Sequence, residues 1–285
     1  MLKNNRLFLS ITLLLISSIM TNISAFQTIS DKEPKTMTTS TSISKIRQIG
    51  DPTLHTPTPL ANIHEAKRVA DNILVMKEDQ KQYQGVGIAC NQSVSVKDPL
   101  AIIIVGTPDE GIKEAAQKRY PDNPIPDAMI MLNPRLVSHG EETYYPEYGE
   151  GCLSVQGPIR GKVKRYKTVT VSYEDLNGNE IERQFSGFAA HIVQHEIDHL
   201  KGTVFLQKIL SDCTAEKKKI IADLVEKEIN RRKLHPEEFA MNNDPILIFD
   251  RKGDEVIFNA ETLSLALTKT PESTLRGILI ELKQS

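Results

Sequence analysis

Hydrophobic residues recur with a helical period between residues 60 and 80. The apolar positions in this stretch are Ile63, Ala66, Val69, Ala70, Ile73, Leu74 and Met76, and most residues between them are polar. Such spacing places the apolar side chains on one face of a helix. The pattern therefore predicts an amphipathic helix over residues 60–80.

Two short apolar runs further along the chain predict buried strands. They are LAIIIVG, residues 100–106, and AMIMLNPRLV, residues 128–137. Apolar and β-branched runs of this length, bounded by Pro or Gly, are typical of buried strands. A polar insert over residues 107–127 separates them.

Alternating residues in KTVTVSYEDLNGNEIERQF, residues 167–185, predict a β-hairpin. The alternation is interrupted at Asn177-Gly178 and then resumes. Asn-Gly between two alternating segments is a strong local signal for a hairpin turn.

Two helices are expected after the hairpin. The first begins near Gly187 with Ser186 as its cap, is apolar on most sides, and ends at Gly202. A helix of this kind is expected to be buried. The second, over residues 214–233, is charged on much of its surface and is expected to face outward.

The pattern changes again after His235-Pro236. Residues 244–282 predict a strand, a turn, a second strand, a short helix and a last apolar segment. Antiparallel strands and a hairpin around one buried helix together predict an α+β fold. The domain organisation expected from these changes is a domain over residues 45–235 and a small β/α extension over residues 236–285, with an unknown role.

The N-terminal residues 1–25 have the features of a secretory signal peptide. Lys3 and Arg6 precede an apolar run that ends in small residues at Ala25. The alternative is that this segment is an uncleaved anchor, in which case the protein would associate with a membrane through this segment alone. Residues 26–44, rich in Ser and Thr, predict a flexible lead-in. The expected location is therefore exported, either periplasmic or secreted, with a cytoplasmic protein as the alternative.

Composition excludes several classes of protein. Hydrophobic residues make up 39% and charged residues 25% of the 285 residues, which is ordinary for a globular domain. A formal net charge of −2 gives no reason to expect nucleic-acid binding. The three cysteines, Cys90, Cys152 and Cys213, are too few and too unevenly spaced for a disulfide framework.

The segment QHEIDHL places metal-binding chemistry on the buried helix. His195 and His199 are four residues apart, so their imidazoles lie on the same face one turn apart and can hold one metal ion. Glu196 points beside that site, where a carboxylate can act on a water molecule. Three ionisable groups on an otherwise apolar helix are costly to bury without such a partner.

The third metal ligand is open on spacing alone. A metzincin would need a histidine at the position of Phe205, so that class fails. A zincin-type metallopeptidase would take a glutamate from a later helix. Cys152, which follows Gly149 and Gly151, offers a thiolate instead. The remaining candidates are Glu216, Glu226, Glu228 and His191, and His191 is discounted because three successive turns of one helix do not easily converge on one ion.

The segment GVGIACNQ, residues 85–92, follows the first amphipathic helix. It fails the dinucleotide fingerprint because no strand precedes it and Cys90 stands at the third glycine position. Its possible use is a backbone edge open to an extended peptide, with Gln92 as an amide donor.

Together, GVGIACNQ, EGCLS and QHEIDH resemble the three motifs of peptide deformylases, in the same order and with similar spacing. The resemblance covers residues 46–209. It implies an enzyme that removes the formyl group from the N-terminal formyl-methionine of peptides or nascent proteins. Among the departures, Cys90 stands where the family commonly has Ala, and Gln156 where it commonly has Pro.

The resemblance also implies roles for individual residues. Cys152, His195 and His199 would hold the metal, which is Fe(II) in the family, with Zn(II), Ni(II) or Co(II) as substitutes. Glu196 would serve as general base and acid. The residues expected at the substrate are Gln92 and the backbone N–H of Leu153 facing the oxyanion, Val86, Gly87 and Gly151 along the peptide backbone, and Arg160 near its downstream end.

Further residues near this site follow from the same resemblance. Glu150 and Arg165 match a pair that braces the cysteine loop, and His191 lies near the pocket for the methionine side chain. Two alternatives to a deformylase stay open at this point. They are a zincin-type metallopeptidase and a non-catalytic paralogue that binds formyl-peptides, and the intact Glu196 argues against the second.

Overall fold

The computed structural model describes residues 46–121 and 124–284. These residues belong to one compact unit, Ser44–Ser285. The expected signal peptide and lead-in, residues 1–25 and 26–44, lie outside the described residues. Within the described ranges, no helix combines the length and apolar character that crossing a membrane requires.

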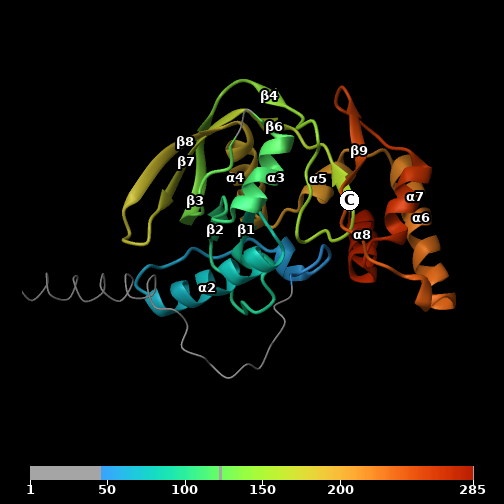
Figure 1. Ribbon diagram of the computed structural model, residues 1–285, viewed down its shortest axis with the longest axis horizontal. Coiled ribbons are helices and arrows are strands. Elements are labelled where there is room, and N and C mark those ends of the chain that lie inside the picture. Colours follow the sequence, from blue (N-terminus) through green and yellow to red (C-terminus); the bar gives the residue numbers. More distant parts are fainter. Residues whose placement is uncertain (1–45, 122–123, 285) are drawn as a thin grey trace, which may run out of the picture. The chain divides into compact units, whose positions relative to one another are not determined.

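A five-stranded antiparallel sheet forms the centre of the fold (Figure 1). The strand order is β1-β2-β3-β7-β8, so β1 lies at one edge. The strands are β1 (Gly87–Ala89), β2 (Ile102–Val105), β3 (Met129–His139), β7 (Thr168–Glu174) and β8 (Glu180–Ser186). Strands at both predicted apolar runs are thereby confirmed.

Helices cover the two faces of this sheet, which explains why β2 is apolar at every position. Helix α2 (Ala66–Gln82) packs Val69, Ile73 and Met76 against Ile102 and Ile104 of β2. Helix α4 (Gly187–Leu200) belongs to the core cluster that contains the alternate residues Ile103 and Val105. Since successive side chains of a strand point to opposite faces, β2 is buried on both sides.

Helix α4 begins where expected, with Ser186 at its N-cap position, but the expected capping hydrogen bond is absent. Ser186 occupies the position before the helix without accepting a hydrogen bond from the first turn. It is still paired with Thr168 as the last residue of β8. Gly187 then has φ +56°, a conformation that lets the chain pass directly from strand to helix.

The predicted hairpin is confirmed as β7 and β8, with a longer connection than an Asn-Gly pair alone. The loop spans residues 175–179. The Asp175 carboxylate accepts hydrogen bonds from the backbone N–H groups of Asn177 and Asn179, each at 2.8 Å. Gly178, at φ +79°, completes the turn.

Two elements differ from the sequence-based expectation. Helix α2 starts at Ala66, six residues after the expected start at residue 60. The polar insert contains a helix that was not predicted, α3 (Glu110–Arg119), which Asp109 caps by accepting from the N–H of Ile112 at 3.0 Å. No residue of α3 is buried, so its apolar pattern gave no signal.

Further elements lie before, between and after the cysteine segment and the hairpin. Strands β4 (Thr143–Tyr144) and β6 (Arg165–Tyr166) form a small antiparallel pair. Helices α5 (Phe205–Ser211) and α6 (Ala215–Leu234) follow α4, so a helix over residues 214–233 is confirmed. Single 3₁₀ turns lie at η1 (Pro52–His55), η2 (Cys90–Gln92) and η3 (Pro236–Glu238).

The C-terminal extension folds as β9 (Ile246–Lys252), β10 (Glu255–Ile257), α7 (Ala260–Thr268) and α8 (Glu272–Gln284). The two predicted strands and the short helix are confirmed, and the last apolar segment is a helix. The antiparallel sheets expected from the sequence are present, and the parallel pairing of β9 with β5 (Ile159–Gly161) adds one exception. Helices α7 and α8 lie beside α6 (Figure 1).

Candidate active site

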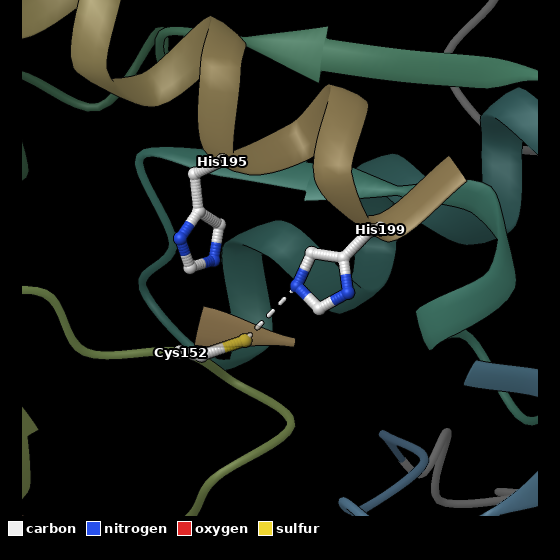
Figure 2. Close-up of side chains that lie close together, drawn as sticks. All are labelled: Cys152, His195 and His199. Atoms are coloured by element: carbon white, nitrogen blue, oxygen red, sulfur yellow. Dashed lines mark hydrogen bonds between the residues drawn. The ribbon is translucent and has the colours of Figure 1, made fainter. Parts of the chain in front are cut away.

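A thiol and two imidazoles converge at the cysteine loop (Figure 2). The ligand atoms of Cys152, His195 and His199 all lie within 4.8 Å of one another. The Cys152 Sγ atom is 3.1 Å from His199 Nε2. One thiolate and two neutral imidazoles are suitable ligands for a tetrahedral divalent metal that keeps one position open. Among the described residues, this is the group of side chains arranged to hold such an ion.

A buried carboxylate orients one of the two imidazoles. The Glu150 carboxylate is 2.8 Å from His195 Nδ1, which leaves His195 Nε2 free to bind a metal. Arg165 donates two hydrogen bonds to Glu150, at 2.6 and 2.8 Å, and a third to Asp198 at 2.5 Å. The structure therefore brings Glu150 and Arg165 together as the motif suggested.

The electrostatics of the site favour a cation. Burial alone would lower the pKa of His195, but hydrogen bonds to Cys152 and Glu150 more than offset it and raise that pKa well above its ordinary value. Burial holds the pKa of His199 well below its ordinary value, so that imidazole is neutral. A site that draws a proton onto His195 in this way suits a metal ion in its place.

Glu196 lies beside the metal ligands with one oxygen of its carboxyl group unpaired. Its side chain is 4% exposed, and its Oε2 atom has no hydrogen-bond partner among the described residues. Burial, the largest effect, raises the pKa of Glu196 to about 7. A carboxyl group with such a pKa can both accept and return a proton near neutral pH.

Gln92 is held so that its amide nitrogen faces the cysteine loop. Its Oε1 accepts a hydrogen bond from the N–H of Ala89 at 2.8 Å. Its Nε2 donates to Ser154 Oγ at 3.2 Å and lies 3.5 Å from Cys152 Sγ. The carbonyl of Leu153 accepts a hydrogen bond from Gln48 at 3.1 Å, which fixes the loop next to the cysteine. The two expected oxyanion donors, Gln92 and the backbone N–H of Leu153, thus lie before and after Cys152 in the sequence, and both are adjacent to it in space.

The edge strand β1 brings the backbone close to the site. A Cβ atom on Gly87 would lie 2.5 Å from Glu196 Oε1 and 2.7 Å from Ile192 Cγ2, so a larger residue has no room there. Val86, just before β1, is half-buried. Because β1 is an edge of the five-stranded sheet, an extended peptide can be added beside it.

The opposite side of the site is formed by the cysteine loop. A Cβ atom on Gly151 would lie 2.7 Å from Arg160 Nη1. Arg160 is fixed by hydrogen bonds from its guanidinium to the carbonyls of Tyr148 and Gly149, at 2.9 and 2.8 Å. Its charge is therefore held at the side of the site rather than free in solvent.

A single pocket of about 390 Å³ joins these groups. Most of the sequence-predicted site residues line it, namely Val86, Gly87, Gln92, Gly151, Cys152, Leu153, Arg160, His195 and Glu196. His199, which is fully buried, lies behind them. The pocket is large enough for a short peptide.

The other candidate metal ligands are engaged elsewhere. His191 Nε2 is 3.2 Å from Glu150 Oε1, whereas His195 is bonded to the other oxygen of that carboxylate, Oε2. Glu228 is paired with Arg231 and Arg232 within α6. Glu216 and Glu226 do not line the pocket.

Sequence reasoning missed two walls of the pocket. One is the end of α3 and the residue after it, where the Tyr120 ring stacks on Phe188 with centroids 3.9 Å apart. The other comes from the C-terminal extension, through Met241, Asn243 and Pro245. Neither segment carries a motif, so only folding reveals their place in the site.

Comparisons with known proteins agree with this geometry. A family model described as polypeptide deformylase matches residues 43–215. Peptide deformylase 2 from Nostoc sp. is 34% identical over 185 residues, which are 64% of this chain and 94% of that protein. A peptide deformylase from Staphylococcus epidermidis is 35% identical over 158 residues, or 53% of this chain and 79% of that protein.

A solved structure of the class I type b peptide deformylase from Acinetobacter baumannii is 34% identical and covers 57% of this chain and 96% of that one, with a TM-score of 0.49. The family model includes every predicted site residue and ends before the C-terminal extension. The chain therefore belongs to the polypeptide deformylase family.

Proposed function

We propose that Cys152, His195 and His199 hold the metal of this peptide deformylase and that Glu196 moves the proton during turnover. The enzyme is a metal-dependent hydrolase that removes the N-formyl group from nascent peptides. The observation that carries the residue assignment is the convergence of one thiol and two imidazoles beside a buried carboxyl group with one unpaired oxygen.

The three ligand side chains determine which chemistry a bound metal would supply. Cys152, His195 and His199 would hold a divalent ion, which would supply Lewis-acid chemistry by making a water more acidic and polarising a carbonyl group. Glu150 keeps His195 in the tautomer that such a site needs. Arg165 in turn keeps Glu150 ionised, because its charge outweighs the effect of burial and holds the pKa of Glu150 well below its ordinary value.

Glu196 accepts the proton of the attacking water and later gives it to the departing amine. Its pKa of about 7 suits both steps, since the ideal acid–base group titrates near the working pH. Its tight fit against Gly87 fixes the position of the carboxyl group. The products are formate and a peptide with a free N-terminal methionine.

Gln92 and the backbone N–H of Leu153 stabilise the negative charge that develops on the formyl oxygen. Each well-placed donor in such a site is worth roughly 3–4 kcal/mol of the activation barrier. The hydrogen bond from Ala89 to Gln92 Oε1 supports this role because it turns the Nε2 donor toward the cysteine loop.

The substrate is an N-formyl-methionyl peptide in an extended conformation. The free edge of β1 supports this proposal, because the backbone near Val86 and Gly87 can pair with a peptide as an added strand. Gly151 and Arg160 lie at the opposite wall, where Arg160 serves the downstream part of the peptide.

The first test replaces Glu196 with glutamine, which keeps the size of the side chain but removes the base. We expect Glu196→Gln to bind metal like the wild type and to lose about 10²–10⁴-fold in kcat on a formyl-methionyl peptide. Formate release and metal content are measured on the same sample. The matched control is Glu226→Gln, an exposed glutamate on α6, and near wild-type turnover of Glu196→Gln contradicts the assignment.

We propose Fe(II) as the native metal, with Zn(II) or Ni(II) able to take its place. A thiolate and two imidazoles accept all three ions, and availability decides among them. Metal analysis of enzyme purified without oxygen, paired with a formate-release assay, tests this proposal. Zinc as the main metal in fully active anaerobic enzyme would contradict it.

We also propose that residues 1–25 direct export of the enzyme. The support is the basic, then apolar, then small-residue pattern of this segment. N-terminal sequencing of the protein from fractionated cells tests it. A mature N-terminus near residue 26 in the exported fraction is expected, and a soluble cytosolic protein that retains Met1 contradicts it.

A further inference from the structure

The C-terminal extension supplies part of the active-site pocket. Met241, Asn243 and Pro245 line the pocket together with the loop that follows Cys152. These three residues lie outside the matched family region, which ends at residue 215. The substrate therefore meets a surface in this protein that the deformylase motifs do not encode.

Hydrogen bonds fix this segment against the cysteine loop at two points. Asn243 Oδ1 accepts from the N–H of Gly157 at 3.0 Å. The N–H of Ile246 donates to the carbonyl of Pro158 at 2.7 Å, at the start of the pairing between β9 and β5. Residues 241–245 are thus a fixed wall of the pocket.

Burial shows which end of the pocket this wall forms. The side chains at the reacting end are almost fully buried, with His195 at 8% and Glu196 at 4% exposed. Met241 is 51% exposed although its side chain is large and apolar. The wall therefore lies on the solvent-exposed side of the pocket, where we expect the residues after methionine to pass.

We propose that Met241 is a specificity-determining residue that contacts an apolar side chain downstream of the formyl-methionine, an inference that rests on the function proposed above. The wall offers side-chain contact because the N–H of Gly157 and the carbonyl of Pro158 are already bonded to the extension. A flexible thioether side chain adapts to apolar groups of different shapes.

The test compares substrates that reach this wall with one that does not. The metal-loaded enzyme is assayed on formyl-Met-Leu-Leu, formyl-Met-Asp-Asp and formyl-Met amide, with Met241→Ala as the variant. We expect kcat/KM for formyl-Met-Leu-Leu to fall about 3- to 10-fold, mainly through KM, because apolar contact area is lost. The kcat/KM for formyl-Met amide stays unchanged. The ratio of kcat/KM for formyl-Met-Leu-Leu to that for formyl-Met-Asp-Asp becomes smaller.

The matched control is Leu265→Ala. Leu265 is 54% exposed on α7 of the same extension and does not line the pocket. This variant keeps the wild-type ratios among the three substrates. An equal change of all three substrates in Met241→Ala indicates a structural effect and overturns the proposal.

Substitutions of Asn243 test whether the position of the wall, residues 241–245, matters for substrate preference. Asn243→Ala removes the acceptor for the N–H of Gly157, and we expect the same narrowing of substrate preference as in Met241→Ala. Asn243→Asp keeps an acceptor oxygen, so we expect the wild-type ratio of kcat/KM between formyl-Met-Leu-Leu and formyl-Met amide, the two substrates without an acidic side chain. An Asn243→Ala variant with wild-type ratios contradicts a fixed wall.

A binding measurement separates this proposal from the assignment of the catalytic residues. Calorimetric titration with the product peptides Met-Leu-Leu and Met amide needs no turnover. We expect Met241→Ala to weaken binding of Met-Leu-Leu about 3- to 10-fold and to leave Met amide unchanged. Equal affinities of wild type and variant for Met-Leu-Leu overturn the contact, whether or not the enzyme releases formate.

Discussion

At the scale of single residues, the metal site depends on side chains that orient its ligands without binding the metal themselves. Helical spacing predicts that His195 and His199 share a face, and the motif resemblance adds Cys152. The two roles of Glu150 depend on packing, since its carboxylate meets His195 and Arg165 from separate segments. A buried carboxylate with donors on both sides is stable only while every donor is present.

Replacing Glu150 tests this arrangement. We expect Glu150→Gln to weaken metal affinity about 10- to 100-fold, because the amide keeps one acceptor oxygen and turns its NH2 donor toward a donor of His195 or Arg165. Titration against a competing chelator measures the affinity. The control is Glu142→Gln, which removes an exposed carboxylate paired with Lys167, and equal affinities of the two variants contradict an orienting role.

At the scale of elements, apolar periodicity predicted helices and strands that are buried in the core and missed a helix that is not buried. Helix α4 and strand β2 were predicted because their side chains form the core. Helix α3 has no buried residue, so its sequence showed only a polar insert and gave no sign of a helix. The parallel pairing of β9 with β5 joins segments about 90 residues apart, and no local pattern specifies such a partner.

Helix α8 depends on a glycine for its close approach to the N-terminal part of the domain. A Cβ atom on Gly277 would lie 1.6 Å from the carbonyl oxygen of Ile49. We expect Gly277→Ala to lower the Tm by about 2–10 °C, although alanine favours a helix, because the backbones must separate. Thermal unfolding measures the change.

The matched control for this substitution is another helical glycine. A Cβ atom on Gly111 of α3 would meet only Asp109 Oδ1, at 3.3 Å. The Tm of Gly111→Ala should therefore stay the same or rise. A Tm of Gly277→Ala equal to that of the wild type would show that α8 can move away at little cost.

At the scale of the whole molecule, the extension and the deformylase domain share one core. Extension residues in the largest cluster are Ile248, Phe249, Val256, Leu263, Ala266, Leu267, Leu275 and Ile278. The same cluster contains Phe205 and Ile209 of α5, and Ile159 of β5. The extension therefore covers the domain beside the cysteine loop and is continuous with its core.

Removal of residues 236–285 is expected to unfold the protein. Burial of a large apolar side chain contributes about 1.5–3 kcal/mol, so the extension contributes as much as the total stability of a typical domain, about 5–15 kcal/mol. Expression of residues 26–235 beside residues 26–285, followed by circular dichroism and thermal unfolding, measures this. A cooperative transition of the shorter chain near the wild-type Tm would show that the deformylase domain folds alone.

The sequence by itself determined the chemistry of this protein, and the tertiary structure decided the shape of its pocket. Helical spacing is a local property, so His195, Glu196 and His199 could be recognised along the chain, and the motif resemblance added Cys152. Tyr120 and Met241 reach the same pocket through long-range packing of α3 and the extension. Such contacts depend on which surfaces meet after folding, and no periodicity within either segment records them.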